Sequence, residues 1–174
     1  MSDGLAKVLA EGVRERGADV VFGFPGGGPN LEVVGAAVEA GLRFVLTHGE
    51  TTACMMAATY GLMTGRPGMA IATRGPGAAC AVNGAAQATL DRFPLLVITD
   101  CVPSADRELF GHQRFDQQQM FSPVTKFSGR LSNNANAPAG RAAARSSAVR
   151  TALAAPGEFD NRPLNFVTGV SICC

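Results

Sequence analysis

Glu50 is a lone carboxylate near the start of the segment "THGETTACMMAATYGLMTG", and the next acidic residue along the chain is Asp91. The residues that follow Glu50 are mostly small or apolar, which predicts a helix that is buried or lies in an interface. A carboxylate at the mouth of such a helix is partly removed from water and suits proton exchange with a bound ligand. The alternative is a plain capping role, because the helix dipole also favours a negative charge at this end.

Two glycine-rich loops follow short apolar runs, "FPGGGPN" and "TRGPG". Glycine lets the backbone approach a ligand or a neighbouring chain closely. The amides at the start of the helix after the second loop could also bind an anion. Neither loop matches the dinucleotide fingerprint or the phosphate-binding loop that ends in Gly-Lys-Ser/Thr. Tight turns and ordinary helix capping explain both loops equally well.

The remaining polar residues do not indicate a metal site or a serine nucleophile. His48 and His112 are the only histidines, and no group of His, Cys, Asp and Glu residues has metal-ligand spacing. A serine triad is not indicated either, because no G-x-S-x-G segment occurs. Gln113 lies in the polar segment "GHQRFDQ", where a solvated loop is at least as good an interpretation as a functional side chain.

The composition predicts one globular domain inside the cell. The chain has 174 residues, of which 47% are hydrophobic and 17% charged, and its net charge is +1. It has no basic stripe for nucleic acid, no apolar run of about 20 residues for a membrane span and no secretory signal. Cys54, Cys80 and Cys101 sit in apolar segments and are expected to be buried, and no CxxC pair occurs. A cytoplasmic location is therefore expected.

Short apolar runs alternate with helical patterns as far as Asp100. The runs expected to be strands are 19–24, 43–47, 68–73 and 94–99, and the expected helices begin near residues 5, 29, 50 and 78. This alternation predicts an α/β fold of three α/β/α layers, in which a mostly parallel sheet is covered on both faces. Ligands of such sheets bind at the carboxyl ends of the strands, which is where Glu50 and the glycine loops fall.

After Asp100 the alternation stops. Residues 109–126 are polar and glutamine-rich, and they indicate a loop with a short helix. Residues 130–140 are expected to be a turn or linker, and residues 141–170 a closing helix and strand. The chain, residues 1–174, is therefore interpreted as a single domain.

Three segments together resemble a known family. They are "GADVVFGFPGGGPNLEV", "HGETTACMMAATYGLMTGRPGMAIATRGPGAACAVNGAAQATLDRFPLLVITD" and "HQRFDQQQMFSPVTK". In this order and spacing they resemble the N-terminal pyrimidine-binding (Pyr) domain of thiamine-diphosphate enzymes, in the group of acetolactate synthase, pyruvate oxidase and benzoylformate decarboxylase. The resemblance runs from about Leu5 to Val167 and implies the thiamine-diphosphate-binding Pyr fold.

The resemblance implies a catalytic role for Glu50. In this family the glutamate hydrogen-bonds the aminopyrimidine ring of thiamine diphosphate and promotes the tautomer that activates the cofactor toward a 2-keto acid. Contacts with the cofactor or the domain interface are implied for Pro25, Gly26, Gly27, Thr73, Gly75, Pro76, Gly77, Asn83 and Gln113. The family commonly has histidine directly before the glutamate, whereas this chain has Gly49 there, which puts a catalytic role for His48 in doubt.

The resemblance also implies that this chain holds half of an active site. Family enzymes bind the diphosphate and Mg²⁺ through another domain, which carries a Gly-Asp-Gly motif, and no such motif occurs here. We therefore expect the central and diphosphate-binding domains to be absent, Mg²⁺ to be held by a partner domain or subunit, and FAD, where it is used, to bind elsewhere. We expect the chain to form a homodimer or a larger assembly and to be inactive without its partner domain. The whole enzyme is expected to be a carboligase or decarboxylase of 2-keto acids.

Two other interpretations stay open at this point. The chain could be a non-catalytic pairing module, or the small subunit of a two-chain decarboxylase. The presence of Glu50 argues against a pure interface, which would favour an apolar residue there. An unrelated anion-binding α/β domain is the third interpretation, and the long run of matching segments argues against it.

Overall fold

The computed structural model describes residues 5–66, 68–102, 109, 111–114, 116–132 and 167–173. The helices are α1 (Leu5–Glu15), α2 (Pro29–Glu39), α3 (Glu50–Thr64), α4 (Pro76–Asp91) and α5 (Gln117–Phe121), followed by the 3₁₀ segment η2 (Ser122–Val124). The strands are β1 (Val20–Phe24), β2 (Arg43–Leu46), β3 (Gly68–Ala72), β4 (Leu95–Cys101), β5 (Phe127–Ser132) and β6 (Val167–Cys173). None of the helices in these ranges is long and apolar enough to cross a membrane.

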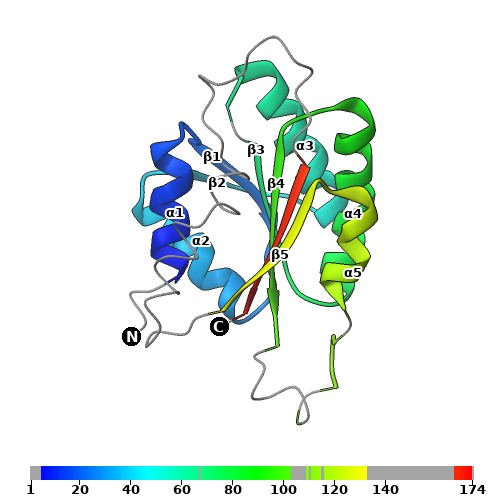
Figure 1. The fold of residues 1–174 in the computed structure, drawn as a ribbon. Helices are drawn as coiled ribbons and strands as arrows, with labels where there is room; N and C mark the ends of the chain where they lie inside the picture. Colours follow the sequence, from blue (N-terminus) through cyan, green and yellow to red (C-terminus); the bar gives the residue numbers. More distant parts are fainter. Residues whose placement is uncertain are drawn as a thin grey trace.

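The strands form one parallel sheet between two layers of helices. The strand order is β2-β1-β3-β4-β6-β5, and each neighbouring pair is parallel. Helices α1 and α2 cover one face, and α3, α4 and α5 cover the other (Figure 1). The three-layer α/β/α architecture predicted from the sequence is therefore confirmed.

Alternate side chains of the strands fill two separate cores. Val21 and Met69 pack on the side of α1 and α2. Phe22 and Ala70, the next residues along the same strands, pack on the side of α3 and α4. Successive side chains of a strand point to opposite faces, so a strand covered on both faces is apolar along its length. This explains the nearly continuous apolar runs in the sequence.

Helices α3 and α4 lie close together because small residues meet between them. A Cβ added to Gly84 would lie 2.4 Å from the Cβ of Cys54, so only glycine fits there without a shift. The Thr51 hydroxyl also donates a hydrogen bond of 2.6 Å to the carbonyl oxygen of Cys80. This packing fixes the first turn of α3, and with it Glu50, against the start of α4.

The structure differs from the sequence-based expectation in the last part of the chain and at two cysteines. β5 ends at Ser132, so residues 130–132 belong to a strand and not to a linker. The rest of the expected linker and closing helix, residues 133–166, lies outside the described residues. Cys54 is buried as expected, but Cys101 is only half-buried and Cys80 is exposed. The reason is that α4 buries only the side that faces α3 and the sheet, and Cys80 lies on the outer side.

Candidate functional site

The topology of the sheet indicates a ligand site at the carboxyl ends of β1 and β3. The two strands are neighbours, but the helices that follow them, α2 and α4, lie on opposite faces. Where the connections of a parallel sheet leave in opposite directions, a crevice opens at the carboxyl ends of the strands, and ligands bind there. The loop of residues 25–28 follows β1 and the loop of residues 73–75 follows β3. The two glycine loops of the sequence therefore flank this crevice.

Thr73 fills the space between the two loops. A Cβ on Gly26 would lie 2.8 Å from the Thr73 Oγ1, and a Cβ on Gly77 would lie 2.6 Å from the Thr73 Cγ2. Both glycines are therefore needed for the close approach of the loops around this threonine. Thr73 thus lies against Gly26 and Gly77, two other residues for which cofactor contacts are implied.

Glu50 is the first residue of α3 and lies against the start of α4. A Cβ added to Gly77 would lie 2.8 Å from Glu50 Oε1, so the carboxylate rests directly on the Gly77 backbone. The Gly49 cap provides no side-chain hydrogen bond, and the Glu50 side chain is half-buried. No ion pair of the described residues involves this carboxylate. Glu50 therefore joins the Gly26–Thr73–Gly77 cluster with oxygen atoms left to meet a ligand.

The Gln113 backbone closes over the second glycine loop. Gly75 has a φ of +68°, and a Cβ there would lie 2.5 Å from the Cβ of Gln113 and 2.8 Å from its carbonyl oxygen. Gln113 itself has a φ of +56°, a conformation that is uncommon outside glycine and often marks a functional position. The structure thus brings Gln113, which is distant in sequence, to the edge of the loop that carries Thr73.

Two buried polar residues beneath the loops were missed by the sequence analysis. The Asn30 amide donates to the carbonyl oxygen of Gly27 at 3.0 Å and to Thr73 Oγ1 at 3.3 Å. The Asp100 Oδ1 accepts the backbone N–H of Arg74 at 2.5 Å. The signal that could have found them is position, because Asn30 opens α2 directly after the first loop and Asp100 ends the apolar run of β4.

Burial raises the pKa of Asp100 above its ordinary value of 3.8. The Asn30 amide, the Arg74 N–H and the positive charge of Arg74 act in the opposite direction, and they offset only part of this effect. Gln117, at the start of α5, completes the polar layer, since its side-chain amide donates to the backbone oxygen of Asp100 at 3.1 Å. A hydrogen bond of 2.7 Å also joins its side-chain oxygen to the Thr99 hydroxyl, which is the donor.

Other sequence-assigned residues lie at the edge of this cluster or away from it. Gly27 is exposed, and a Cβ there would meet no atom of the described residues within 4 Å, so these residues leave open space beside the first loop. Pro25 is half-buried in that loop, and Pro76 is exposed at the first position of α4. Asn83 is exposed seven residues further along α4, which places it about 10 Å from Pro76 along the helix axis. His48 is exposed, like His112.

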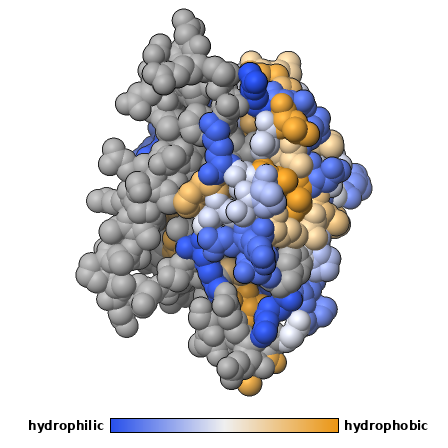
Figure 2. Space-filling model, turned by 45° about the vertical axis from the view of Figure 1, so that its right-hand side comes forward, coloured by the Kyte–Doolittle hydropathy of each residue, from blue (hydrophilic) through white to orange (hydrophobic). Residues whose placement is uncertain are grey.

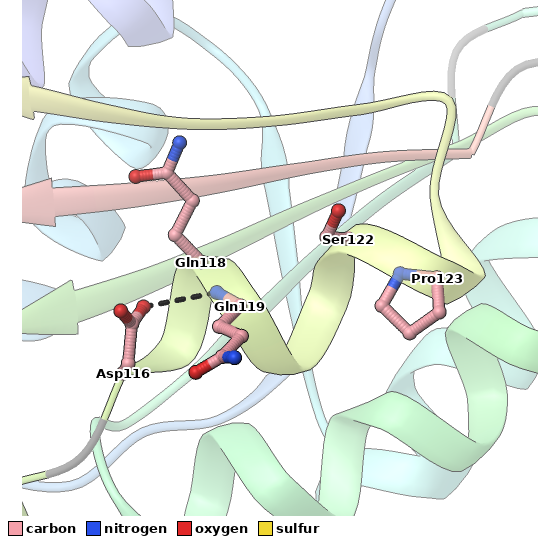
Figure 3. Close-up of a pocket in the computed structure, with 5 residues that line it drawn as sticks. All are labelled: Asp116, Gln118, Gln119, Ser122 and Pro123. Carbon is pink, nitrogen blue, oxygen red and sulfur yellow. Dashed lines mark hydrogen bonds between the residues drawn. The ribbon is translucent and has the colours of Figure 1, made fainter.

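The described residues contain no group of three or more His, Cys, Asp or Glu side chains that could hold a metal ion. An open surface pocket lies along α5 and η2, lined by Asp116, Gln118, Gln119, Ser122 and Pro123 (Figure 3). Its carboxylate already caps α5, because Asp116 Oδ1 accepts the backbone N–H of Gln119 at 2.9 Å. This pocket includes none of the residues predicted to bind the cofactor.

The outer side of α3 exposes several large apolar side chains together with two threonines. Met55, Met56, Leu62 and Met63 are all exposed there, and we call this set the α3 apolar face. Their spacing puts them on one side of the helix, opposite to Cys54 and Ala57. Figure 2 shows the molecule from the side that carries α4, where apolar areas lie among polar residues. A single chain therefore leaves large apolar side chains in contact with water.

Comparison with known proteins gives consistent matches. The family model described as "Thiamine pyrophosphate enzyme, N-terminal TPP binding domain" matches residues 4–121. The chain is 34% identical over 123 residues to a catabolic acetolactate synthase of Raoultella terrigena, covering 71% of this chain and 21% of that protein. It is 33% identical over 128 residues to 2-hydroxyacyl-CoA lyase 1 of Homo sapiens, with coverages of 74% and 22%.

A match with the acetolactate synthase large subunit of Corynebacterium glutamicum covers most of the chain. The two are 33% identical over 169 residues, which cover 93% of this chain and 27% of that subunit. The chain therefore spans only about a fifth to a quarter of the length of the curated relatives it matches.

Proposed function

The chain belongs to the thiamine pyrophosphate enzymes, as their N-terminal TPP-binding domain, and from this premise we propose that it supplies Glu50 to activate the cofactor of a 2-keto acid carboligase or decarboxylase. The observation that carries the proposal is the place of Glu50. Its carboxylate starts α3, rests on Gly77 and has no ion-pair partner among the described residues. It stands beside the crevice at which ligands of parallel sheets bind.

The residues around the crevice fit the pyrimidine half of thiamine diphosphate. A half-buried carboxylate can hydrogen-bond a ring nitrogen, and open space beside Gly27 admits a planar group. When bound, the cofactor supplies the electron sink for chemistry at a carbonyl carbon. The chain's own contribution is to hold one proton between Glu50 and the bound ring, while Thr73, Gly26 and Gly77 keep the loops in place. Gln113 would face the reacting groups from the edge of the second loop.

The diphosphate half of the cofactor requires residues from another domain or subunit. Mg²⁺ prefers oxygen ligands such as carboxylates, and no acidic cluster that could hold it occurs among the described residues. We therefore propose that Mg²⁺ and the diphosphate are held by a partner domain or subunit, and that FAD, where the whole enzyme uses it, binds outside this chain. The α3 apolar face would lie in the resulting assembly, with a homodimer as the simplest arrangement.

Replacement of Glu50 by glutamine tests the proposal. In the enzyme assembled with its diphosphate-binding domain or subunit, Glu50→Gln should lower kcat by roughly 10²–10⁴-fold, because the amide cannot exchange the proton. Turnover of a 2-keto acid such as pyruvate is measured, together with urea unfolding to show that the fold is intact.

Glu32→Gln is the matched control, because Glu32 is also an acidic residue in the first turn of a helix, and it is exposed on α2. This control should leave turnover unchanged. Full turnover of the Glu50→Gln enzyme would show that Glu50 has no catalytic role.

The alternative function is a non-catalytic pairing module or the small subunit of a two-chain decarboxylase. The exposed Met55, Met56, Leu62 and Met63 favour a role in association. One measurement separates the pairing module from the proposed function. A pairing module would associate with its partner and show no turnover even with Glu50 in place, whereas the proposed enzyme part gives turnover that depends on Glu50.

A further inference from the structure

The base of the crevice holds a buried carboxyl group that is not ion-paired. Asp100 is only 2% exposed, and its Oδ2 is buried without a hydrogen-bond partner among the described residues. The ion pairs in the described part of the chain are Lys7–Glu11 and Arg66–Asp19, and neither involves Asp100. A carboxylate buried in this way loses its hydration without the full compensation that a paired cation would give.

Asn30 presents a second buried acceptor that is also without a partner. It is 2% exposed, and its Oδ1 makes no hydrogen bond with the described residues. The side-chain NH₂ is already used, because it donates to the carbonyl oxygen of Gly27 and to Thr73 Oγ1. A carbonyl oxygen only accepts hydrogen bonds, so turning the amide over would place two acceptors against each other at Gly27. Asn30 and Asp100 line one small internal cavity with Pro29, Val33, Ile98 and Thr99.

We propose that Asp100 is held as a neutral carboxylic acid whose Oδ2–H donates to Asn30 Oδ1, and that it is a positioning residue for both glycine loops. One proton then satisfies both buried acceptors. The acid is linked to the second loop by the N–H of Arg74, and through Asn30 it is linked to Gly27 of the first loop. The inference rests on the proposed function only in so far as these loops hold the cofactor.

The surroundings of Asp100 favour the neutral form. Burial raises the pKa of its carboxyl group, as described above. Among the described residues, the charge that acts on this carboxyl group is the guanidinium of Arg74 in the loop after β3, and it lowers the pKa in part. α2 brings the uncharged Asn30 amide, whose hydrogen bond also lowers the pKa in part, and α5 brings the uncharged Gln117, which donates to the Asp100 backbone; burial is the larger effect.

Infrared spectroscopy of the chain alone tests the protonation state. At a pH of about 5.5 ordinary Asp and Glu side chains are ionised, so a carboxylic-acid C=O band at that pH reports a group with a raised pKa. We expect this band in the native chain and its loss in Asp100→Asn. Asp19→Asn is the control and should keep the band, because the Asp19 carboxylate is paired with Arg66 and accepts the Tyr60 hydroxyl at 2.6 Å.

The pH dependence of unfolding gives a second readout. Between the ordinary pKa of 3.8 and the raised pKa of the folded chain, the native state keeps a proton that the unfolded chain has released. The folded-to-unfolded ratio of the wild type, relative to Asp100→Asn, should therefore fall by up to about tenfold per pH unit as the pH rises through this window. Above the folded pKa the two profiles should run parallel.

Substitution also tests the positioning role. Asn can accept the Arg74 N–H and donate to Asn30 as the neutral acid does, whereas Leu can do neither. In NMR spectra, Asp100→Leu should shift the amide resonances of Gly27 and Arg74, and Asp100→Asn should restore them. Unchanged resonances in Asp100→Leu would overturn the positioning role.

The native wild-type chain gives a test that needs no substitution. A carbon-13 NMR titration of the aspartate carboxyl groups should show one group that titrates above the others. If no aspartate titrates late and the infrared band is absent, Asp100 is ionised and the proposal is wrong. Because these measurements use no cofactor, their outcome is independent of the Glu50→Gln result.

Discussion

At the scale of single residues, the thiol pKa of Cys54 reflects both its burial in α3 and the negative charge of Glu50. Burial and, to a smaller extent, the negative charge of Glu50 raise the pKa of the Cys54 thiol to about 12. The thiolate is the reactive form of cysteine. In the native chain at about pH 8, we therefore expect iodoacetamide to leave Cys54 unmodified, while the exposed Cys80 is alkylated. Peptide mapping by mass spectrometry measures the two sites separately.

Unfolding provides the control for this labelling experiment. In concentrated denaturant both thiols should react, which shows that the sites differ through their environment and not through the local sequence. Native labelling of Cys54 as fast as Cys80 would mean that α3 does not pack on α4 as the structure has it.

The sequence singles out candidate site residues, but it does not indicate the contacts between them. Glu50 was found because one carboxylate stands before a long apolar segment, and Gly26 and Gly75 because glycines cluster after strands. Asn30 and Asp100 were missed because their roles depend on a meeting of α2 with β4, about 70 residues away in sequence. From the sequence alone, a polar residue at the end of an apolar run is interpreted as an exposed loop residue. Its burial becomes evident only when the fold is known.

At the scale of elements, the contact between α3 and α4 depends on glycine at position 84. Gly84→Ala would place a Cβ 2.4 Å from the Cβ of Cys54 and 3.0 Å from the carbonyl oxygen of Thr51. Overpacking of this kind costs about 1–3 kcal/mol, which should exceed the gain of about 1 kcal/mol from replacing a helical glycine by alanine. We expect a lower free energy of unfolding, measured by urea denaturation.

Gly35→Ala is the matched substitution in α2. A Cβ there would meet no atom of the described residues within 4 Å, so the substitution acts only through the higher helix propensity of alanine. This variant should be more stable than the wild type by about 0.5–1 kcal/mol. If both alanine variants were stabilised equally, α3 and α4 would not be in close contact at Gly84.

Element boundaries were predictable where local signals are strong. α3 runs from Glu50 to Thr64 as expected, because Gly65 ends it in the left-handed conformation with a φ of 66°. β5 was missed because "FSGRLS" has a glycine and polar residues in place of an apolar run. Its partner is β6, which is more than 30 residues further along the chain, and a pairing of that range leaves no local pattern.

At the scale of the whole molecule, the α3 apolar face predicts association. Met63 is 80% exposed in the single chain, and Met56 and Leu62 are also uncovered. Burial of apolar surface drives most protein association, and a two-fold dimer is the commonest arrangement. Sedimentation of the chain at tens of micromolar should therefore show dimers or larger species.

Charge placed on this face should separate the copies without unfolding them. Met63→Glu should raise the dimer dissociation constant by about tenfold or more, since burial of an unpaired carboxylate in an interface costs well over the 1.4 kcal/mol that a factor of ten requires. Val38→Glu is the control, because Val38 is exposed on α2, in the helix layer on the opposite side of the sheet. Val38→Glu should associate like the wild type. If both substitutions raised the dimer dissociation constant equally, the cause would be a general effect of charge. If the wild type were a monomer, the α3 apolar face would not pair in this chain alone.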